Sequence, residues 1–118
     1  MRYGSPRKNL TTVERDVMEM EANYKAAKVL ILRSLWMMGQ LQPNNLESSM
    51  AKAKAGLSAT KITQKAVEIM GPLGYSRKYL LEKCMRDAKI NDIFEGTGQI
   101  NMLIVARLLL NYSRDELK

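Results

Sequence analysis

One stretch decides the fold and the candidate site of this 118-residue chain: RDAKINDIFEGTGQI, residues Arg86–Ile100. One helical pattern ends within it and another begins, and the carboxylate of Glu95 lies at the break. Thr97 stands where it can cap the second helix, whose N-terminus offers unpaired backbone N–H groups. Gly96 permits close backbone approach, and a helix N-terminus favours anionic or carbonyl groups. The stretch therefore predicts a ligand site at a junction between two helices.

Helical patterns extend from this junction in both directions. The predicted helices cover residues 12–38, 45–70, 77–90 and 98–110. Capping boxes are expected at Thr11 with Glu14 and at Asn44 with Glu47, and Gly39 is expected to end the first helix. No alternation typical of a strand and no internal repeat is present.

Residues that end or begin helices complete this pattern. Gly71-Pro72 is expected to stop the second helix, and Ser76 to cap the third. The single cysteine, Cys84, falls within the third predicted helix, and no histidine is present to pair with it. We therefore expect Cys84 to be a buried structural thiol. An apolar stripe expected to face the core runs along the first helix at Val13, Val17, Met20, Tyr24, Ala27, Ile31, Leu35 and Met38.

Composition restricts the class of protein. Hydrophobic residues make up 46% and charged residues 26%, as in an ordinary globular domain. A chain without histidine and with one cysteine is not expected to hold a transition metal. No apolar run approaches the length of a membrane span and the N-terminus is not a signal peptide, so we expect no membrane insertion and a cytoplasmic location.

Two long antiparallel helices, a short one and a terminal one predict an all-α, up-and-down helical bundle. We expect an irregular N-terminal arm over residues 1–10, the bundle over 11–112 and a polar tail over 113–118. Helices of this length leave apolar surface uncovered in so short a chain. The chain is therefore expected to associate with partner chains or further segments rather than remain a monomer.

The stretch Arg86–Ile100 closely resembles the C-terminal motif of acyl-CoA dehydrogenases, the flavoenzymes that desaturate fatty acyl thioesters. The family pattern is Arg-Asp-Ala, a short variable segment, then Ile-Tyr/Phe-Glu-Gly-Thr-X-Gln-Ile, at the spacing found here. In similar enzymes the Glu is the catalytic base, and the Thr and Gln lie at the flavin. The resemblance implies these roles for Glu95, Thr97 and Gln99. It also implies substrate contacts at Glu95 and Gly96, with the Glu95 N–H donating to the thioester carbonyl.

A second motif, QKAVEIMGPLGY (Gln64–Tyr75), resembles the family's helix end and glycine turn. In related enzymes this segment reaches the adenosine diphosphate part of a flavin held by a neighbouring subunit, which implies cofactor contacts at Glu68 and Gly71. Two positions depart from the family pattern, because Glu68 replaces the usual Gln and Pro72 replaces a second Gly. A carboxylate near a pyrophosphate is repulsive and proline lacks an N–H, so both departures weigh against flavin contact here.

For the chain as a whole, the resemblance implies the C-terminal bundle of an acyl-CoA dehydrogenase of the short- or medium-chain type, without the bundle's first helix. Such an enzyme introduces an α,β double bond into an acyl-CoA thioester. FAD accepts the hydride, an electron-transferring flavoprotein is the oxidant, and the bundle mediates homo-oligomerisation. We expect the isolated chain to be inactive, because flavin and substrate also need domains that it lacks.

Two alternatives remain open. The chain could be a non-catalytic, truncated helical interaction or oligomerisation module of the same family, which the departures at Glu68 and Pro72 favour. It could also be a basic nucleic-acid binder, for which only the net charge of +7 speaks. Lysine and arginine are spread along the chain and aromatic residues are scarce, so we prefer a solvated basic face and expect no nucleic-acid partner.

Overall fold

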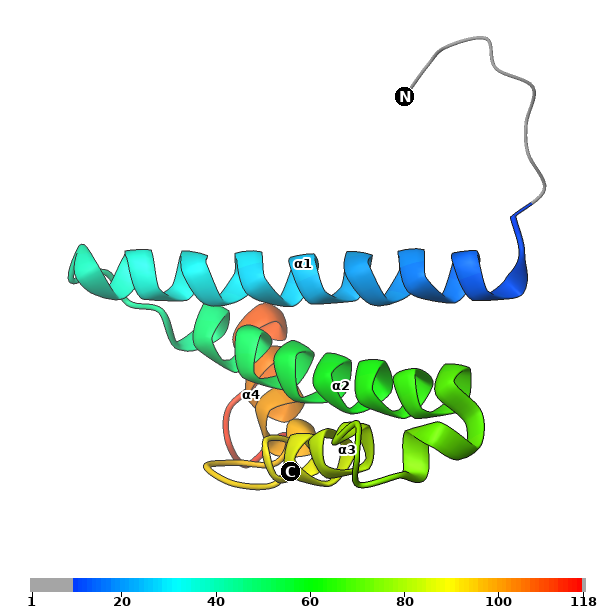
Figure 1. The fold of residues 1–118 in the computed structure, drawn as a ribbon. Helices are drawn as coiled ribbons and strands as arrows, with labels where there is room; N and C mark the ends of the chain where they lie inside the picture. Colours follow the sequence, from blue (N-terminus) through cyan, green and yellow to red (C-terminus); the bar gives the residue numbers. More distant parts are fainter. Residues whose placement is uncertain (1–9, 118) are drawn as a thin grey trace, which may run out of the picture.

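The computed structural model describes residues 10–117, and every regular element in that range is helical. The elements are α1 (Thr12–Gly39), α2 (Asn45–Met70), the short 3₁₀ helix η1 (Gly71–Tyr75), α3 (Leu81–Ile90) and α4 (Gly98–Leu110). α1 and α2 run antiparallel, α3 lies on the side of α2 away from α1, and α4 crosses behind α2 (Figure 1). The predicted all-α bundle is confirmed. The expected N-terminal arm falls almost entirely outside the described residues.

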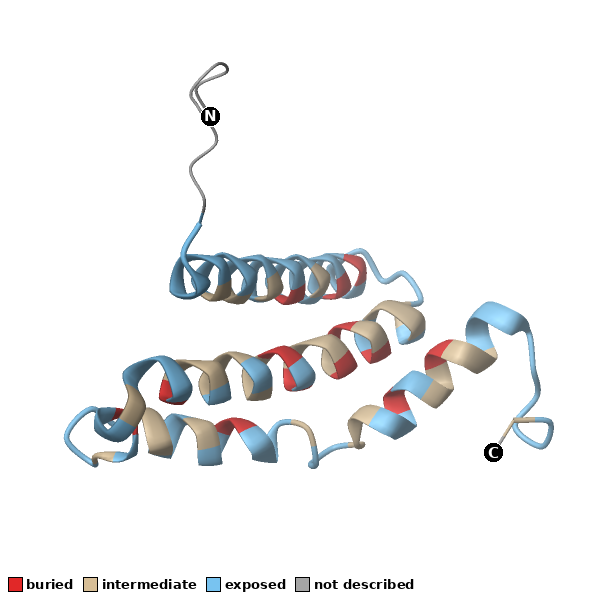
Figure 2. Ribbon diagram, turned by 90° about the vertical axis from the view of Figure 1, so that its right-hand side faces the viewer, coloured by how far each residue is buried: buried red, intermediate tan, exposed pale blue. Residues whose placement is uncertain are grey.

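α2 is the centre of the fold. α1, η1, α3 and α4 each pack on it, whereas no Cα of α1 comes within 8 Å of a Cα of α3 or α4. Small side chains make this possible, because they let neighbouring helices approach α2 from several directions. Figure 2 shows α2 between α1 and the layer of α3 and α4, with buried positions along its length. These buried positions are Ser49, Ala51, Ala53, Gly56, Ser58 and Val67.

The predicted apolar stripe of α1 is not the face that packs on α2. Of its eight members only Ala27 is buried, Met20 is half-buried, and the others are exposed. The buried residues of α1 are Ala27, Ser34 and Met37. At about 100° per residue, this face is rotated by roughly a fifth of a turn from the predicted stripe. The stripe prediction was wrong because small and polar residues, not the largest apolar ones, give the closest approach to α2.

Several helix ends confirm the predictions. Thr11 caps α1, since its hydroxyl accepts from the Glu14 N–H at 3.2 Å while the Glu14 carboxylate accepts from the Thr11 N–H at 2.8 Å. α2 ends at Met70, and Gly71 follows it with a φ of 58°. Thr97 caps α4 by accepting from the Ile100 N–H at 3.2 Å.

Other helix ends correct the predictions. Asn44 makes no side-chain cap; its amide instead donates to the Ser34 carbonyl at 3.0 Å and closes the α1–α2 turn. Gly39 remains helical, and the left-handed residue after α1 is Leu41, with a φ of 54°. α3 begins at Leu81 rather than near residue 77, after Leu80 adopts a left-handed conformation. In each case tertiary geometry outweighs a local preference.

Two further corrections concern single side chains in this part of the chain. Ser76 does not cap α3; its hydroxyl accepts from the Lys78 N–H at 3.2 Å inside the turn before the helix. Cys84, expected to be a buried structural thiol, is exposed. It lies one turn before Ala88, which is the buried residue of that helix. Among residues 10–117 no helix is both long and apolar enough to cross a bilayer.

Candidate functional site

Residues 91–97 join α3 to α4 in a tightly hydrogen-bonded loop. The N–H groups of Ile93 and Phe94 both donate to the Ile90 carbonyl at 3.0 Å, which continues the last turn of α3. The Gly98 N–H donates to the Asp92 carbonyl at 3.2 Å and closes the loop at the start of α4. The junction predicted from the sequence is therefore an ordered structure with a fixed path.

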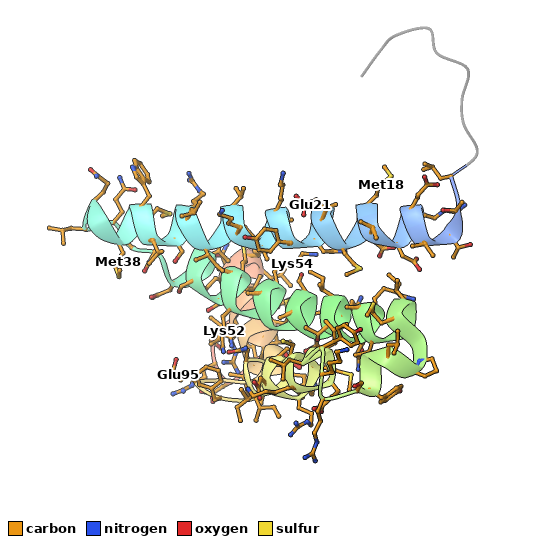
Figure 3. All side chains as sticks on the ribbon, viewed as in Figure 1. Met18, Glu21, Met38, Lys52, Lys54 and Glu95 are labelled. Carbon is orange, nitrogen blue, oxygen red and sulfur yellow. The ribbon has the colours of Figure 1, made fainter. Side chains whose placement is uncertain are left out.

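Glu95 occupies the outer edge of this loop. Its φ is 54° and that of Gly96 is 97°, so two successive residues are left-handed, which for the glutamate costs about 1 kcal/mol. The carboxylate is exposed and points away from the helices (Figure 3). It has no hydrogen bond or ion pair within residues 10–117.

The backbone around Glu95 is equally open to a ligand. Over residues 10–117 the N–H groups of Glu95, Gly96 and Thr97 have no hydrogen-bond partner. Three successive free donors at the start of a helix form a set suited to carbonyl or anionic oxygens. This donor set fits both a thioester carbonyl and the electron-rich edge of a flavin.

One residue of the junction escaped the sequence analysis. Asn101, only 8% exposed, donates its amide to the Gly96 carbonyl at 3.0 Å and to the Thr97 carbonyl at 3.1 Å. It therefore fixes the direction in which residues 95–97 present their N–H groups. The available signal was an amide within the otherwise apolar run of residues 100–106, four residues after Thr97.

An apolar groove of about 600 Å³ opens next to this junction. It lies between α1 and α4 and has α2 as its floor. Gln99, which is exposed, stands at the end of the groove nearest to the loop. The other lining residues are Leu30, Met50, Ala53, Lys54, Leu57, Asp92, Gly98, Met102 and Val105.

The remaining predicted cofactor contacts lie at the other end of α2. Glu68 is about 24 Å along the helix from Lys52, which contacts the Glu95 loop, and Gly71 lies beyond it, directly after the end of α2. The Glu68 carboxylate accepts from the Lys65 ammonium at 2.6 Å, and this hydrogen bond and charge raise the pKa of Lys65. The structure thus brings Glu95, Thr97 and Gln99 together but keeps Glu68 and Gly71 apart from them.

Comparison with known proteins decides the family. Residues 4–110 match the family model of the acyl-CoA dehydrogenase C-terminal domain. The chain belongs to this family. Its relatives include the mitochondrial short-chain specific acyl-CoA dehydrogenase of Bos taurus, 34% identical over 95% of this chain and 27% of the relative. Acryloyl-CoA reductase (NADH) of Anaerotignum propionicum is also 34% identical, over 91% of this chain and 27% of the relative.

Solved structures agree with this acyl-CoA dehydrogenase assignment. Butyryl-CoA dehydrogenase from Megasphaera elsdenii is 29% identical with a TM-score of 0.83, over 93% of this chain and 29% of that chain. A structure described as the electron-transferring flavoprotein of Acidaminococcus fermentans is 30% identical with the same TM-score and the same coverage of both chains. The chain spans just over a quarter of the length of such relatives.

Proposed function

We propose that this chain is the C-terminal domain of an enzyme that introduces an α,β double bond into an acyl-CoA thioester, with Glu95 as the base. One observation carries the proposal: within residues 10–117 the carboxylate of Glu95 and the N–H groups of residues 95–97 have no partner, and they lie in one three-residue segment. Bound FAD would supply the acceptor for the hydride that leaves the β-carbon.

The proton step assigns two tasks to the same residue. A Glu95 carboxylate oxygen takes the α-proton, and the electron pair of the broken C–H bond moves toward the thioester carbonyl. The Glu95 N–H donates to that carbonyl oxygen and stabilises its growing negative charge. A carboxylate works best as a base where water is excluded, and Glu95 is exposed in this chain. The cover must come from ligand and further domains, so the isolated chain is expected to be inactive.

The predicted cofactor contacts are proposed to serve two different flavins. Thr97 and Gln99 flank the Glu95 site and would contact the flavin that serves it. Glu68 and Gly71, at the far end of α2, would contact a flavin held by a neighbouring subunit of a homo-oligomer. Lys65 partly offsets the negative charge of Glu68, which lessens the expected repulsion from a pyrophosphate. We further propose an electron-transferring flavoprotein as the oxidant.

The test is Glu95→Gln in the enzyme that contains this chain. We expect kcat to fall by roughly 10² to 10⁴-fold, the usual contribution of a general base, while FAD absorbance and acyl-CoA binding persist. Glu21→Gln is the matched control, because Glu21 is an exposed glutamate on α1 that pairs only with Lys25, at 3.0 Å (Figure 3). Full activity of the Glu95→Gln enzyme would refute the assignment of the base.

A second candidate is a non-catalytic oligomerisation module of the same family, which the departure at Pro72 and the open apolar groove favour. Reading the coding sequence upstream of Met1 separates the two. An open frame that encodes the remaining dehydrogenase domains supports the enzyme. A stop codon immediately upstream, with no companion gene for those domains nearby, supports the module.

A further inference from the structure

A lysine of α2 reaches the loop that carries Glu95. The Lys52 ammonium donates to the Asn91 carbonyl at 2.5 Å and lies 4.1 Å from the centroid of the Phe94 ring. It forms no ion pair with a carboxylate of residues 10–117. Both groups that stabilise its charge therefore belong to the loop, one at its start and one directly before Glu95.

The loop backbone packs against the next turn of α2. Gly56 follows Lys52 by four residues and so lies on the same face of the helix. A Cβ at Gly56 would stand 3.2 Å from both the Asn91 carbonyl oxygen and the Asp92 Cα, so the loop backbone rests directly on α2. Gly56 sets how closely the loop approaches, and Lys52 holds it from the side.

We infer that Lys52 is a positioning residue that fixes the Glu95 loop by binding the Asn91 carbonyl and the face of Phe94. The peptide of Phe94 leads directly into Glu95, so the orientation of the Phe94 backbone sets the direction of the Glu95 carboxylate and of the free N–H groups. For catalysis this inference rests on the proposed function of Glu95. The physical claim about the loop stands independently of it.

The first measurement is hydrogen exchange, followed by mass spectrometry, on the folded assembly purified with this chain. Lys52→Met keeps the length and the apolar stem of the side chain but removes its charge. We expect peptides covering residues 91–98 to exchange roughly threefold to tenfold faster, as loss of a cation–π contact and a charged hydrogen bond implies. Lys52→Arg should restore protection, because a guanidinium can both donate to the carbonyl and stack on the ring.

Lys54→Met is the matched control. Lys54 lies two residues further along the same helix, and its ammonium donates to the Asn23 side chain of α1 at 2.9 Å rather than to the loop. Figure 3 shows Lys52 near Glu95 and Lys54 near α1. The control should leave peptides 91–98 unchanged. Equal protection of the loop in wild type and Lys52→Met, or equal loosening by Lys54→Met, would overturn the inference.

Phe94→Leu examines the same contact from the loop side. This variant keeps the bond between Lys52 and the Asn91 carbonyl, so its loop should exchange faster than wild type but more slowly than that of Lys52→Met. In the double variant Lys52→Met/Phe94→Leu the contact between cation and ring is already lost with the lysine, so exchange should be little faster than in Lys52→Met alone. Additive effects of the two substitutions would show that Lys52 and Phe94 act independently.

Kinetics of the complete enzyme supply the functional readout. We expect Lys52→Met to lower kcat by roughly tenfold to a hundredfold with KM and FAD absorbance unchanged, and Lys52→Arg to recover most of the loss. A loosened loop with an unchanged kcat would refute the positioning role. Failure of the proposed function would give a different result. If Glu95 is not the base, Glu95→Gln retains activity, whatever Lys52→Met does to the loop.

Discussion

Of the two residues that order the junction, Thr97 could be predicted from the sequence and Asn101 could not. Thr97 was predicted as a cap because its partner, the Ile100 N–H, is three residues away and the rule is local. Asn101 was missed because its amide binds two backbone carbonyls, a contact that no apolar or capping pattern encodes. Both side chains help to set the orientation of the free N–H groups of residues 95–97.

Loss of the Thr97 hydroxyl should therefore be measurable. Thr97→Ala leaves the Ile100 N–H without a partner, and we expect the free energy of unfolding to fall by about 1 kcal/mol. Thr63→Ala is the control, because the Thr63 hydroxyl donates to carbonyls of its own helix, those of Ala59 and Thr60, and alanine is the better helix former. Urea unfolding of the purified assembly gives both values, and equal losses would contradict the capping argument.

The helices themselves were largely predictable, and their exceptions have physical causes. Apolar periodicity and the helix-ending residues predicted both ends of α2, the end of α3 and the whole of α4. The start of α3 does not, because the chain must first reverse direction through η1 and a left-handed Leu80. Asn44 fits a capping box, yet its amide gains a partner at Ser34 across the α1–α2 turn. A local rule fails where a contact with another helix offers the same group a partner.

Gly74 and Gly39 should differ in how substitution by alanine changes the free energy of unfolding. A Cβ at Gly74 would meet the Val67 carbonyl oxygen at 2.7 Å, and backbone cannot yield easily. We expect Gly74→Ala to lower the free energy of unfolding by about 1–3 kcal/mol through overpacking. Gly39 is helical with nothing within 4 Å of the added carbon, so Gly39→Ala should be neutral or stabilising. Thermal unfolding of both variants distinguishes these outcomes.

The first turn of α1 should depend on pH. The Thr11 N–H, and then the Thr11 hydroxyl, hold the pKa of Glu14 below its usual 4.5. Because the folded state lowers this pKa, its contribution to stability is complete above 4.5 and is lost as the pH falls through the folded value. Amide protection of residues 12–16 should decrease in that window. Glu14→Gln should remove the dependence, and Glu21→Gln should leave it unchanged.

The four helices form an open arrangement. Its accessible surface is 9438 Å², against about 6500 Å² for a compact protein of this mass. Its radius of gyration is 17.9 Å, against about 13.5 Å for a compact domain of this length. Among residues 10–117 no large side chain is fully buried.

Association is therefore expected of the purified chain. Sedimentation should show species larger than 13.4 kDa, and a hydrophobic dye should bind wherever the apolar groove remains open. Met38, 58% exposed on α1, is a suitable reporter, because an interface that covers α1 should protect its sulfur from oxidation (Figure 3). A monomer that binds no dye would contradict this expectation.

The position of α2 also determines how the chain comes apart. α1 and α4 both pack on α2, and no Cα of α1 lies within 8 Å of a Cα of α4, so detachment of either helix leaves the packing of the other on α2 in place. Loss of α2 removes the support of every other helix at once. In the isolated chain the peripheral helices should open in separate steps with separate free energies, so one melting temperature would not describe unfolding. All-or-none behaviour would require a partner that bridges α1 and α4.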